Sequence, residues 1–279
     1  MPVGGTSTYF DTAAVADGSA PAVANSSNFF NATVAANHKE GAEELALLKY
    51  VYARPDLDQL RGDPDAVCNA IDDFAATIPR GLMTIGAEKR AFITRLLDAT
   101  TTTTDDENVP TTFLEFGSYV GYSAICLASA MVKRAGTSRR VRYVSFEKNP
   151  IIAAVAASLC DLAGLRDVVS ITVGSAGESL SRLVRAGAVG PKSVDFVLLD
   201  HWKDLYIADL QICERESLLR PGSVVLADNI VFPGAPEYLA YVQKGKAEES
   251  PEGYKYVTET ADFILPFGGP DQLAISTVA

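Results

Sequence analysis

The feature that most constrains the fold is an alternation, from Thr112 onward, of short apolar runs with longer stretches of helical periodicity. The apolar runs are Thr112–Phe116, Val141–Phe146, Val168–Val173, Val194–Leu199 and Val224–Ala227. The helical stretches lie at about 122–134, 150–163, 176–187 and 205–218. Such alternation is typical of right-handed βαβ units. The sequence therefore predicts an α/β fold, in which a parallel sheet carries helices on both faces.

Further elements flank this region. Helices are predicted from Gly41 to Arg54, from the Asp63-Pro64 cap to about residue 76, from 87 to 97 and from 236 to 244. Late strands are predicted at Tyr254–Thr260 and Leu273–Thr277. Residues 1–37 contain no Lys or Arg and show no sustained period, which is typical of an extended tail. We expect a low-complexity N-terminal tail over 1–37 and a single domain over 38–279.

Composition and charge exclude several classes of protein. The formal net charge is −11, and nucleic-acid binding requires a basic face, so nucleic acid is not the expected partner. No run approaches about 18 apolar residues, which predicts no membrane span. The N-terminus has neither the basic nor the apolar region of a secretory signal. The four cysteines are far apart and form no C-x-x-C pair. We expect reduced thiols and a cytoplasmic location.

The loop after the first strand is rich in glycine. It reads Glu115-Phe-Gly-Ser-Tyr-Val-Gly-Tyr-Ser123, and Tyr119 stands where a dinucleotide fingerprint requires its second glycine. A ligand without a pyrophosphate, such as S-adenosylmethionine, therefore fits better than a nicotinamide dinucleotide. Glu147 ends the second strand, where a carboxylate can accept both hydroxyls of a ribose. A purely structural glycine turn is the alternative.

Acidic and amide side chains end two further strands. Asp200 follows the fourth strand, and Asp228 and Asn229 follow the fifth. Ligands of open parallel sheets bind at the carboxyl ends of the strands, and carboxylate and amide oxygens suit Mg²⁺. These residues predict a magnesium site, although a helix cap at Asp200 and a turn at Asp228-Asn229 are the alternative. Lys203 lies close by in sequence and could act as a general base beside a dication.

Three segments together resemble the catechol O-methyltransferase family. They are Leu114-Glu-Phe-Gly-Ser-Tyr-Val-Gly-Tyr-Ser-Ala124, Leu199-Asp-His-Trp-Lys-Asp204, and Leu226-Ala-Asp-Asn229 followed by Phe232-Pro-Gly-Ala-Pro236. The resemblance runs from about Lys39 to near the C-terminus. It implies a Rossmann-like class I methyltransferase with a seven-stranded, mostly parallel sheet whose last strand is antiparallel.

The resemblance also assigns roles. Cofactor contacts are implied for Ile85, Glu115, Gly117, Tyr119, Tyr122, Ser123, Glu147, Asp200, His201 and Trp202. Mg²⁺ ligands are implied at Asp200, Asp228 and Asn229, and Lys203 is implied as the catalytic base. Acceptor contacts are implied for Met83, Trp202, Lys203, Asn229 and Pro233. The implied reaction is Mg²⁺-dependent methyl transfer from S-adenosylmethionine to a hydroxyl of a small, aromatic catechol-like molecule, by a monomer or weak homodimer.

The sequence departs from the family at four places. Leu265 stands where the family has a glutamate that binds the second catechol hydroxyl, with Asp262 or Glu259 as the alternative for that role. Gly81, or Arg80 in a shifted alignment, stands where the family has a tryptophan. Ala176-Gly177 replaces a Ser-Gln pair that contacts adenine, and Lys148 follows the ribose acid where the family has an apolar residue. The transfer residues are retained while the acceptor pocket is altered. A different hydroxylated metabolite is therefore the alternative acceptor, and a catalytically silent cofactor-binding protein is the alternative from another class.

Overall fold

The computed structural model describes residues 41–79, 81–100, 110–136, 140–244, 253–265 and 268–279. The predicted tail at 1–37 lies outside the described residues, so the tail and the 38–279 boundary stay predictions. Within the described ranges, no helix combines the length and the apolar character that a membrane crossing requires.

Seven strands form one sheet, in the order β3-β2-β1-β4-β5-β7-β6. The strands are β1 (Thr111–Phe116), β2 (Val141–Glu147), β3 (Val169–Val173), β4 (Val194–Leu199), β5 (Leu219–Ala227), β6 (Tyr256–Ile264) and β7 (Pro270–Val278). Strands β1 to β5 pair in parallel, and β7 runs antiparallel to both β5 and β6. The predicted seven-stranded, mostly parallel sheet with an antiparallel last strand is confirmed.

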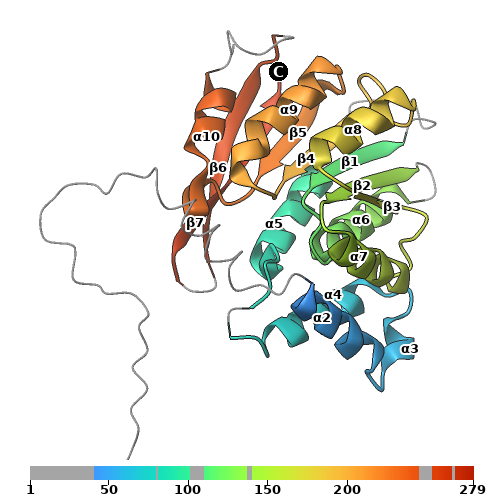
Figure 1. The fold of residues 1–279 in the computed structure, drawn as a ribbon. Helices are drawn as coiled ribbons and strands as arrows, with labels where there is room; N and C mark the ends of the chain where they lie inside the picture. The colour runs from blue at the N-terminus through green and yellow to red at the C-terminus, as the bar shows by residue number, and fades with distance from the viewer. Residues whose placement is uncertain (1–40, 80, 101–109, 137–139, 245–252, 266–267) are drawn as a thin grey trace, which may run out of the picture.

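Helices cover both faces of the sheet, as predicted (Figure 1). One face carries α8 (Ala176–Arg185), α9 (Tyr206–Arg215) and α10 (Pro236–Gln243), and the other carries α5 (Gly86–Ala99), α6 (Tyr122–Ala135) and α7 (Pro150–Leu162). Three N-terminal helices pack beside this second group, because α2 contacts α7 and α4 contacts α6. They are α2 (Ala42–Tyr52), α3 (Leu57–Leu60) and α4 (Pro64–Ala75), drawn in shades of blue in Figure 1. Two separate hydrophobic cores result, one on each side of the sheet.

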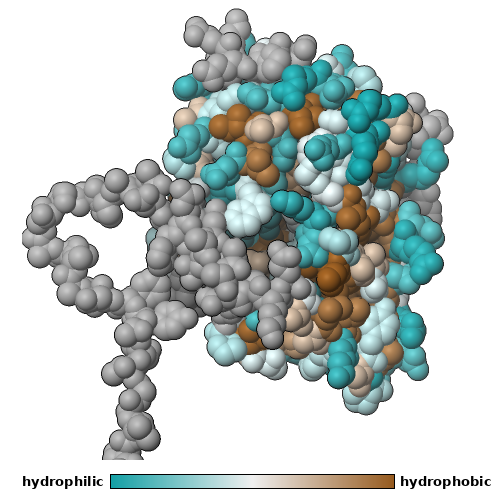
Figure 2. Space-filling model, in the orientation of Figure 1, coloured by the Kyte–Doolittle hydropathy of each residue, from teal (hydrophilic) through white to brown (hydrophobic). Residues whose placement is uncertain are grey.

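The strands show why the sequence divides its apolar residues between two cores. Successive side chains of a strand point to opposite faces. Phe113 accordingly packs in the core beneath α5 and α6, while Leu114 and Phe116 pack in the core beneath α8 and α9. On the visible face the surface is largely hydrophilic, and its hydrophobic residues lie in separate patches (Figure 2).

Most elements agree with the prediction to within a few residues, and two do not. Strand β5 begins at Leu219, five residues before the predicted start. The prediction missed these residues because Pro221 and Gly222 interrupt the apolar pattern. The backbone nevertheless pairs with β4 there, with a register shift between Val194 and Phe196. The single-turn helix α3 was not predicted. The Asp63 cap of α4 is confirmed, since its side chain accepts a hydrogen bond from the Ala66 amide.

Strand pairing brings three chain segments to one edge of the sheet. Leu199 at the end of β4 pairs with Ala227 at the end of β5, which in turn pairs with Ala274 of β7. Because β7 is antiparallel, its first residues lie beside the last residues of β5. The edge where the parallel strands end therefore also receives the beginning of β7.

Candidate active site

The glycine loop after β1 makes close backbone contact with the end of β4. Gly117 has a φ of 102°, and a Cβ atom there would lie 2.5 Å from the Asp200 carbonyl oxygen. Only glycine combines this backbone conformation with this approach. Tyr119 also has a positive φ, of 45°, and its amide donates to Glu147 Oε2 at 3.0 Å. The loop therefore joins the tips of β1, β2 and β4.

Two predicted cofactor residues on this loop have side chains committed to the protein interior. The buried Glu115 carboxyl accepts hydrogen bonds from the hydroxyls of Ser123 and Ser145, and burial raises its pKa to about 8. Tyr122 donates from its hydroxyl to Asp72 of α4 at 3.0 Å. These contacts hold the first turn of α6 in place, so the backbone of this segment is the part best placed to meet a ligand.

Glu147 lies at the end of β2, as predicted for the ribose acid. Its Oε2 accepts from the Tyr119 amide, and its Oε1 accepts from the Asn149 amide at 2.8 Å. Burial raises the pKa of Glu147, and these backbone hydrogen bonds act against that rise. Each carboxylate oxygen can accept more than one hydrogen bond, so this fixed carboxylate can still accept from two ribose hydroxyls.

The structure brings the three predicted metal ligands together. Asp200 and Asp228 each follow a residue of the Leu199–Ala227 pair, and the Asp228 amide donates to the Leu199 carbonyl at 3.0 Å. Asn229 has a φ of 57°, a left-handed conformation that asparagine adopts more readily than most residues. Asp228 Oδ1 accepts from the Asn229 amide at 2.8 Å. The convergence expected from the strand ends is therefore present.

The electrostatics of this group suit a divalent cation. Burial raises the pKa of Asp200 to about 7, and the neighbouring Asp228 carboxylate adds to the rise. A cation between the two carboxylates would relieve this repulsion. Within the described ranges no group of three or more His, Cys, Asp and Glu side chains is placed to hold a metal, so a site here depends on the Asn229 amide oxygen as its third ligand. Two carboxylates and an amide oxygen are hard ligands, and they fit Mg²⁺.

Lys203, the predicted base, extends toward the same group from the turn before α9. Its Nζ lies 3.5 Å from Asp200 Oδ1 and donates to Asn229 Oδ1 at 3.3 Å. It also donates to the Tyr206 hydroxyl at 2.6 Å, and that hydroxyl donates to the Asp228 carbonyl at 3.1 Å. Tyr206 was not predicted as a site residue. Its hydroxyl holds the lysine amine over the predicted metal ligands.

His201 and Trp202, the predicted adenine neighbours, differ in exposure. His201 packs against Phe116 and Tyr206, and its Nε2 lies 2.7 Å from Asp209 Oδ2. Burial lowers the pKa of His201, and the Asp209 hydrogen bond opposes this. Trp202 is 48% exposed, which leaves its ring surface available to a ligand.

One departure from the family pattern has a steric explanation. A Cβ atom on Gly177 would lie 2.6 Å from Asp209 Oδ1. The glycine that replaces the expected glutamine therefore makes room for the Asp209 carboxylate.

The predicted acceptor residues come from two segments. Met83 and Ile85 precede α5, and Met83 is 52% exposed while Ile85 is buried. Pro233 lies in the turn η3 (Ile230–Gly234) directly after the predicted metal ligands, and the Phe232–Pro233 peptide bond is cis. The contact of these residues with a substrate stays a prediction.

Sequence reasoning missed two charged residues at this edge, Lys89 and Asp271. Lys89 Nζ lies 2.5 Å from Asp228 Oδ1 and 2.7 Å from Asp271 Oδ2. Burial lowers the pKa of Lys89, but both carboxylates act against it and the pKa is raised overall. The only available signal was the position of Asp271 just before a late strand, and the sequence did not show that this strand pairs with β5.

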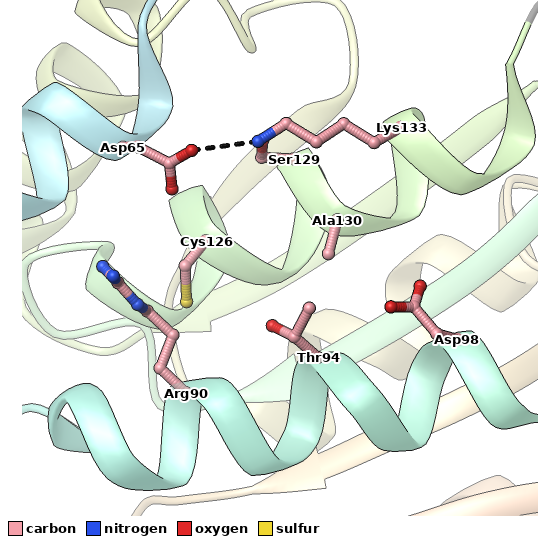
Figure 3. A pocket seen from close by; sticks show the side chains of 8 residues that line it. All are labelled: Asp65, Arg90, Thr94, Asp98, Cys126, Ser129, Ala130 and Lys133. Carbon is pink, nitrogen blue, oxygen red and sulfur yellow. Dashed lines mark hydrogen bonds and ion pairs between the residues drawn. The ribbon is translucent and has the colours of Figure 1, made fainter.

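A separate hollow of about 140 Å³ lies between α5 and α6, beside the start of α4 (Figure 3). Arg90, Thr94 and Asp98 line it from α5, and Lys133 of α6 pairs with Asp65 of α4 at 3.0 Å. It contains none of the predicted site residues. The strand-end group is therefore the better candidate for the active site.

Comparisons with known proteins identify the family of this chain. A family model described as a methyltransferase domain matches residues 114–230. Catechol O-methyltransferase from Mus musculus is 36% identical over 211 residues, covering 75% of this chain and 71% of the mouse protein. The Bos taurus catechol O-methyltransferase is 36% identical over 182 residues, covering 65% of this chain and 61% of the bovine protein, which is less than two thirds of its length.

Among solved structures, the O-methyltransferase from Bacillus cereus in complex with SAH has a TM-score of 0.59 at 22% identity, covering 77% of this chain and 91% of that one. This likeness shows the fold. The sheet order shows a Rossmann-like fold, and the methyltransferase-domain match together with the mouse relative identifies the chain as a class I methyltransferase. Within that class, the chain belongs to the catechol O-methyltransferase family of S-adenosylmethionine-dependent O-methyltransferases.

Proposed function

We propose that this protein transfers a methyl group from S-adenosylmethionine to a hydroxyl of a catechol or catechol-like small molecule, with Mg²⁺ as the metal cofactor. The observation that carries the proposal is the convergence of Asp200, Asp228 and Asn229 beneath the Lys203 amine. A helix cap and a turn would not require Asp200 and Asn229 to contact one lysine, Lys203.

The donor side of the site is formed by the ends of β1 and β2. We assign the methionine end of the cofactor to the loop from Gly117 to Ser123 and its ribose to Glu147. His201 is held by Asp209, and together with Trp202 it would border the adenine. This half contributes binding and orientation, because displacement at a sulfonium methyl requires the acceptor oxygen, the methyl carbon and the sulfur to lie in line.

The acceptor side contributes proton removal and positioning. When bound, Mg²⁺ would supply Lewis acidity that eases ionisation of an acceptor hydroxyl. Asp200, Asp228 and Asn229 would hold it. Lys203 Nζ takes the proton from the attacking oxygen, and the Tyr206 hydroxyl keeps that amine in position. Met83, Trp202 and Pro233 would wall the aromatic ring of the acceptor.

A different hydroxylated metabolite is the alternative acceptor. Leu265 stands where the family has the glutamate that binds the second hydroxyl, so one recognition contact for a catechol is replaced by an apolar side chain. An acceptor with a single reactive hydroxyl would not require that contact. The donor half and the metal ligands are the same for both acceptor classes.

The test is a product assay. The protein is mixed with S-adenosylmethionine and a panel of catechols and monophenols, with Mg²⁺ or with a chelator, and methylated products are detected by mass spectrometry. We expect products from catechols with Mg²⁺ and none with chelator. Equal methylation of monophenols that is unaffected by chelator would reject the metal role. Cofactor binding without turnover on any acceptor would favour the silent binding protein.

The remaining expectations concern the protein as a whole. We propose a cytoplasmic location and a monomer or weak homodimer, with no nucleic-acid partner. The net charge of −11 supports the last of these. Light scattering of the full chain over a range of concentrations would test the oligomeric state.

A further inference from the structure

The chemistry around Asn229 fixes which end of its side-chain amide faces the predicted metal site. An amide has a donor end, Nδ2, and an acceptor end, Oδ1, and the two ends are interchangeable in shape. Asn229 Nδ2 donates to Asp271 Oδ2 at 2.8 Å, and Asn229 Oδ1 accepts from Lys203 Nζ at 3.3 Å. Turning the amide over would place its donor end against the donating Lys203 Nζ and its acceptor end against the Asp271 carboxylate.

Asp271 is itself held rigidly. It is 1% exposed, and its Oδ2 also accepts from Lys89 Nζ at 2.7 Å. Its Oδ1 accepts from the Phe232 amide at 3.2 Å and from the Val231 amide at 3.4 Å. A carboxylate paired to a lysine only accepts hydrogen bonds, so it can bind only the donor end of the neighbouring amide.

Lys89 connects the same network to a second predicted ligand. Its Nζ donates to Asp228 Oδ1 at 2.5 Å, and this oxygen also accepts from the backbone N–H of Asn229. In the described part of the chain Asp228 Oδ2 has no hydrogen-bond partner. Lys89 thus restrains Asp228 and leaves one of its oxygens for a cation.

We propose that Asp271, held by Lys89, is a positioning residue that turns the Asn229 amide oxygen toward the metal. This inference rests on the proposed function, because it presumes that Asp200, Asp228 and Asn229 bind a dication. It adds a role for a residue of β7 that contacts neither the cofactor nor the predicted metal. Residues that orient metal ligands in this way commonly change metal affinity by about 10- to 100-fold when they are replaced.

The test measures Mn²⁺ binding to the full chain in the presence of S-adenosylmethionine, by the electron paramagnetic resonance signal of free Mn²⁺. We expect Asp271→Asn to weaken Mn²⁺ binding by about 10- to 100-fold. Asp271→Glu keeps the charge but displaces the carboxylate by one methylene, and it should also weaken binding. If Asp271 acted only through its charge, Asp271→Glu would bind Mn²⁺ with the affinity of the wild type.

The exchange variant Asn229→Asp with Asp271→Asn separates positioning from structural support. It keeps the net charge and presents an oxygen to the metal whichever way residue 229 turns, and the left-handed backbone at 229 also tolerates aspartate. We expect it to recover most of the affinity that Asp271→Asn loses. A loss that the exchange does not restore would mean that Asp271 acts only as structural support.

Asp195→Asn is the matched control. Asp195 is also buried and paired with an arginine, Arg220, but it lies at the beginning of β4, the opposite end of the strand from Asp200. The Asp195→Asn variant should have a lower melting temperature than the wild type and a Mn²⁺ affinity within about twofold of the wild-type value. The inference is overturned if Asp271→Asn binds Mn²⁺ like the wild type, or if the control loses as much affinity. If the wild-type protein itself binds no Mn²⁺, the metal site of the proposed function fails, and the inference fails with it.

Discussion

The two halves of the candidate site are built in different ways. The donor half, at the ends of β1 and β2, is held mostly by contacts between the glycine loop and its neighbouring strand, such as the Tyr119 amide on Glu147, with one contact from Tyr122 to Asp72 of α4. The metal half, at the ends of β4 and β5, depends on Lys89 and Asp271, which are 139 and 42 residues away in sequence from Asp228 and Asn229 respectively. A local motif can therefore specify most of the first half, whereas the second half requires side chains that only the complete fold brings together.

This difference explains what the sequence could predict. The βαβ alternation predicted the sheet, and the strand-end rule placed Asp200 beside Asp228, because each residue directly follows an apolar run. Lys89 could not be found in this way, since a lysine on a predicted helix usually faces solvent. Asp271 required knowledge that β7 pairs with β5, and the Asp209 carboxylate beside Gly177 required side-chain placement. The residues that orient other residues were therefore missed.

The largest expected effect comes from replacing a predicted metal ligand, which should impair catalysis but not cofactor binding. Asp228→Ala removes a predicted ligand and leaves Lys89 without one of its two carboxylates. We expect kcat/KM to fall about 1000-fold or more, since a metal contributes several kcal/mol to such a reaction. Cofactor affinity, measured by isothermal titration calorimetry, should stay within about threefold of the wild type. Equal loss of cofactor binding would show that the halves are not independent.

Acidity should weaken metal binding through Asp200. The pKa of Asp200 is raised to about 7, so its carboxyl is protonated below that pH and ionised above it. A proton and a cation compete for this group, so Mn²⁺ affinity should fall about tenfold for each pH unit below about 7 and level off above it. Asp200→Asn should remove this dependence at the cost of overall affinity. Affinity that is constant between pH 5 and 8 would contradict the assignment of Asp200 as a ligand.

A smaller effect should be confined to the donor half. Glu147→Gln replaces one acceptor oxygen by a donor group that faces a backbone amide. Losing one or two hydrogen bonds to a charged acceptor should weaken S-adenosylmethionine binding about 10- to 30-fold. Mn²⁺ binding to the cofactor-free protein should not change. A variant that loses Mn²⁺ instead would show that Glu147 serves the other half.

The smallest expected effect comes from removing the Tyr206 hydroxyl, which holds the predicted base Lys203. Tyr206→Phe removes the hydroxyl that accepts from Lys203 Nζ, while Asn229 and Asp200 still hold the amine. One neutral hydrogen bond is worth about 1 kcal/mol, so kcat should fall about fivefold with little change in cofactor affinity. An unchanged kcat would mean that Lys203 needs no help from Tyr206.

The hydrogen bonds from the backbone of Val231 and Phe232 to Asp271 have a practical meaning for enzyme redesign. The same carboxylate anchors the turn that carries Pro233 and the side-chain amide of Asn229, so the proposed pocket wall on that side cannot be widened without disturbing a predicted metal ligand. Efforts to admit bulkier acceptors should therefore vary Met83 and Trp202, whose exposed side chains lie outside this network.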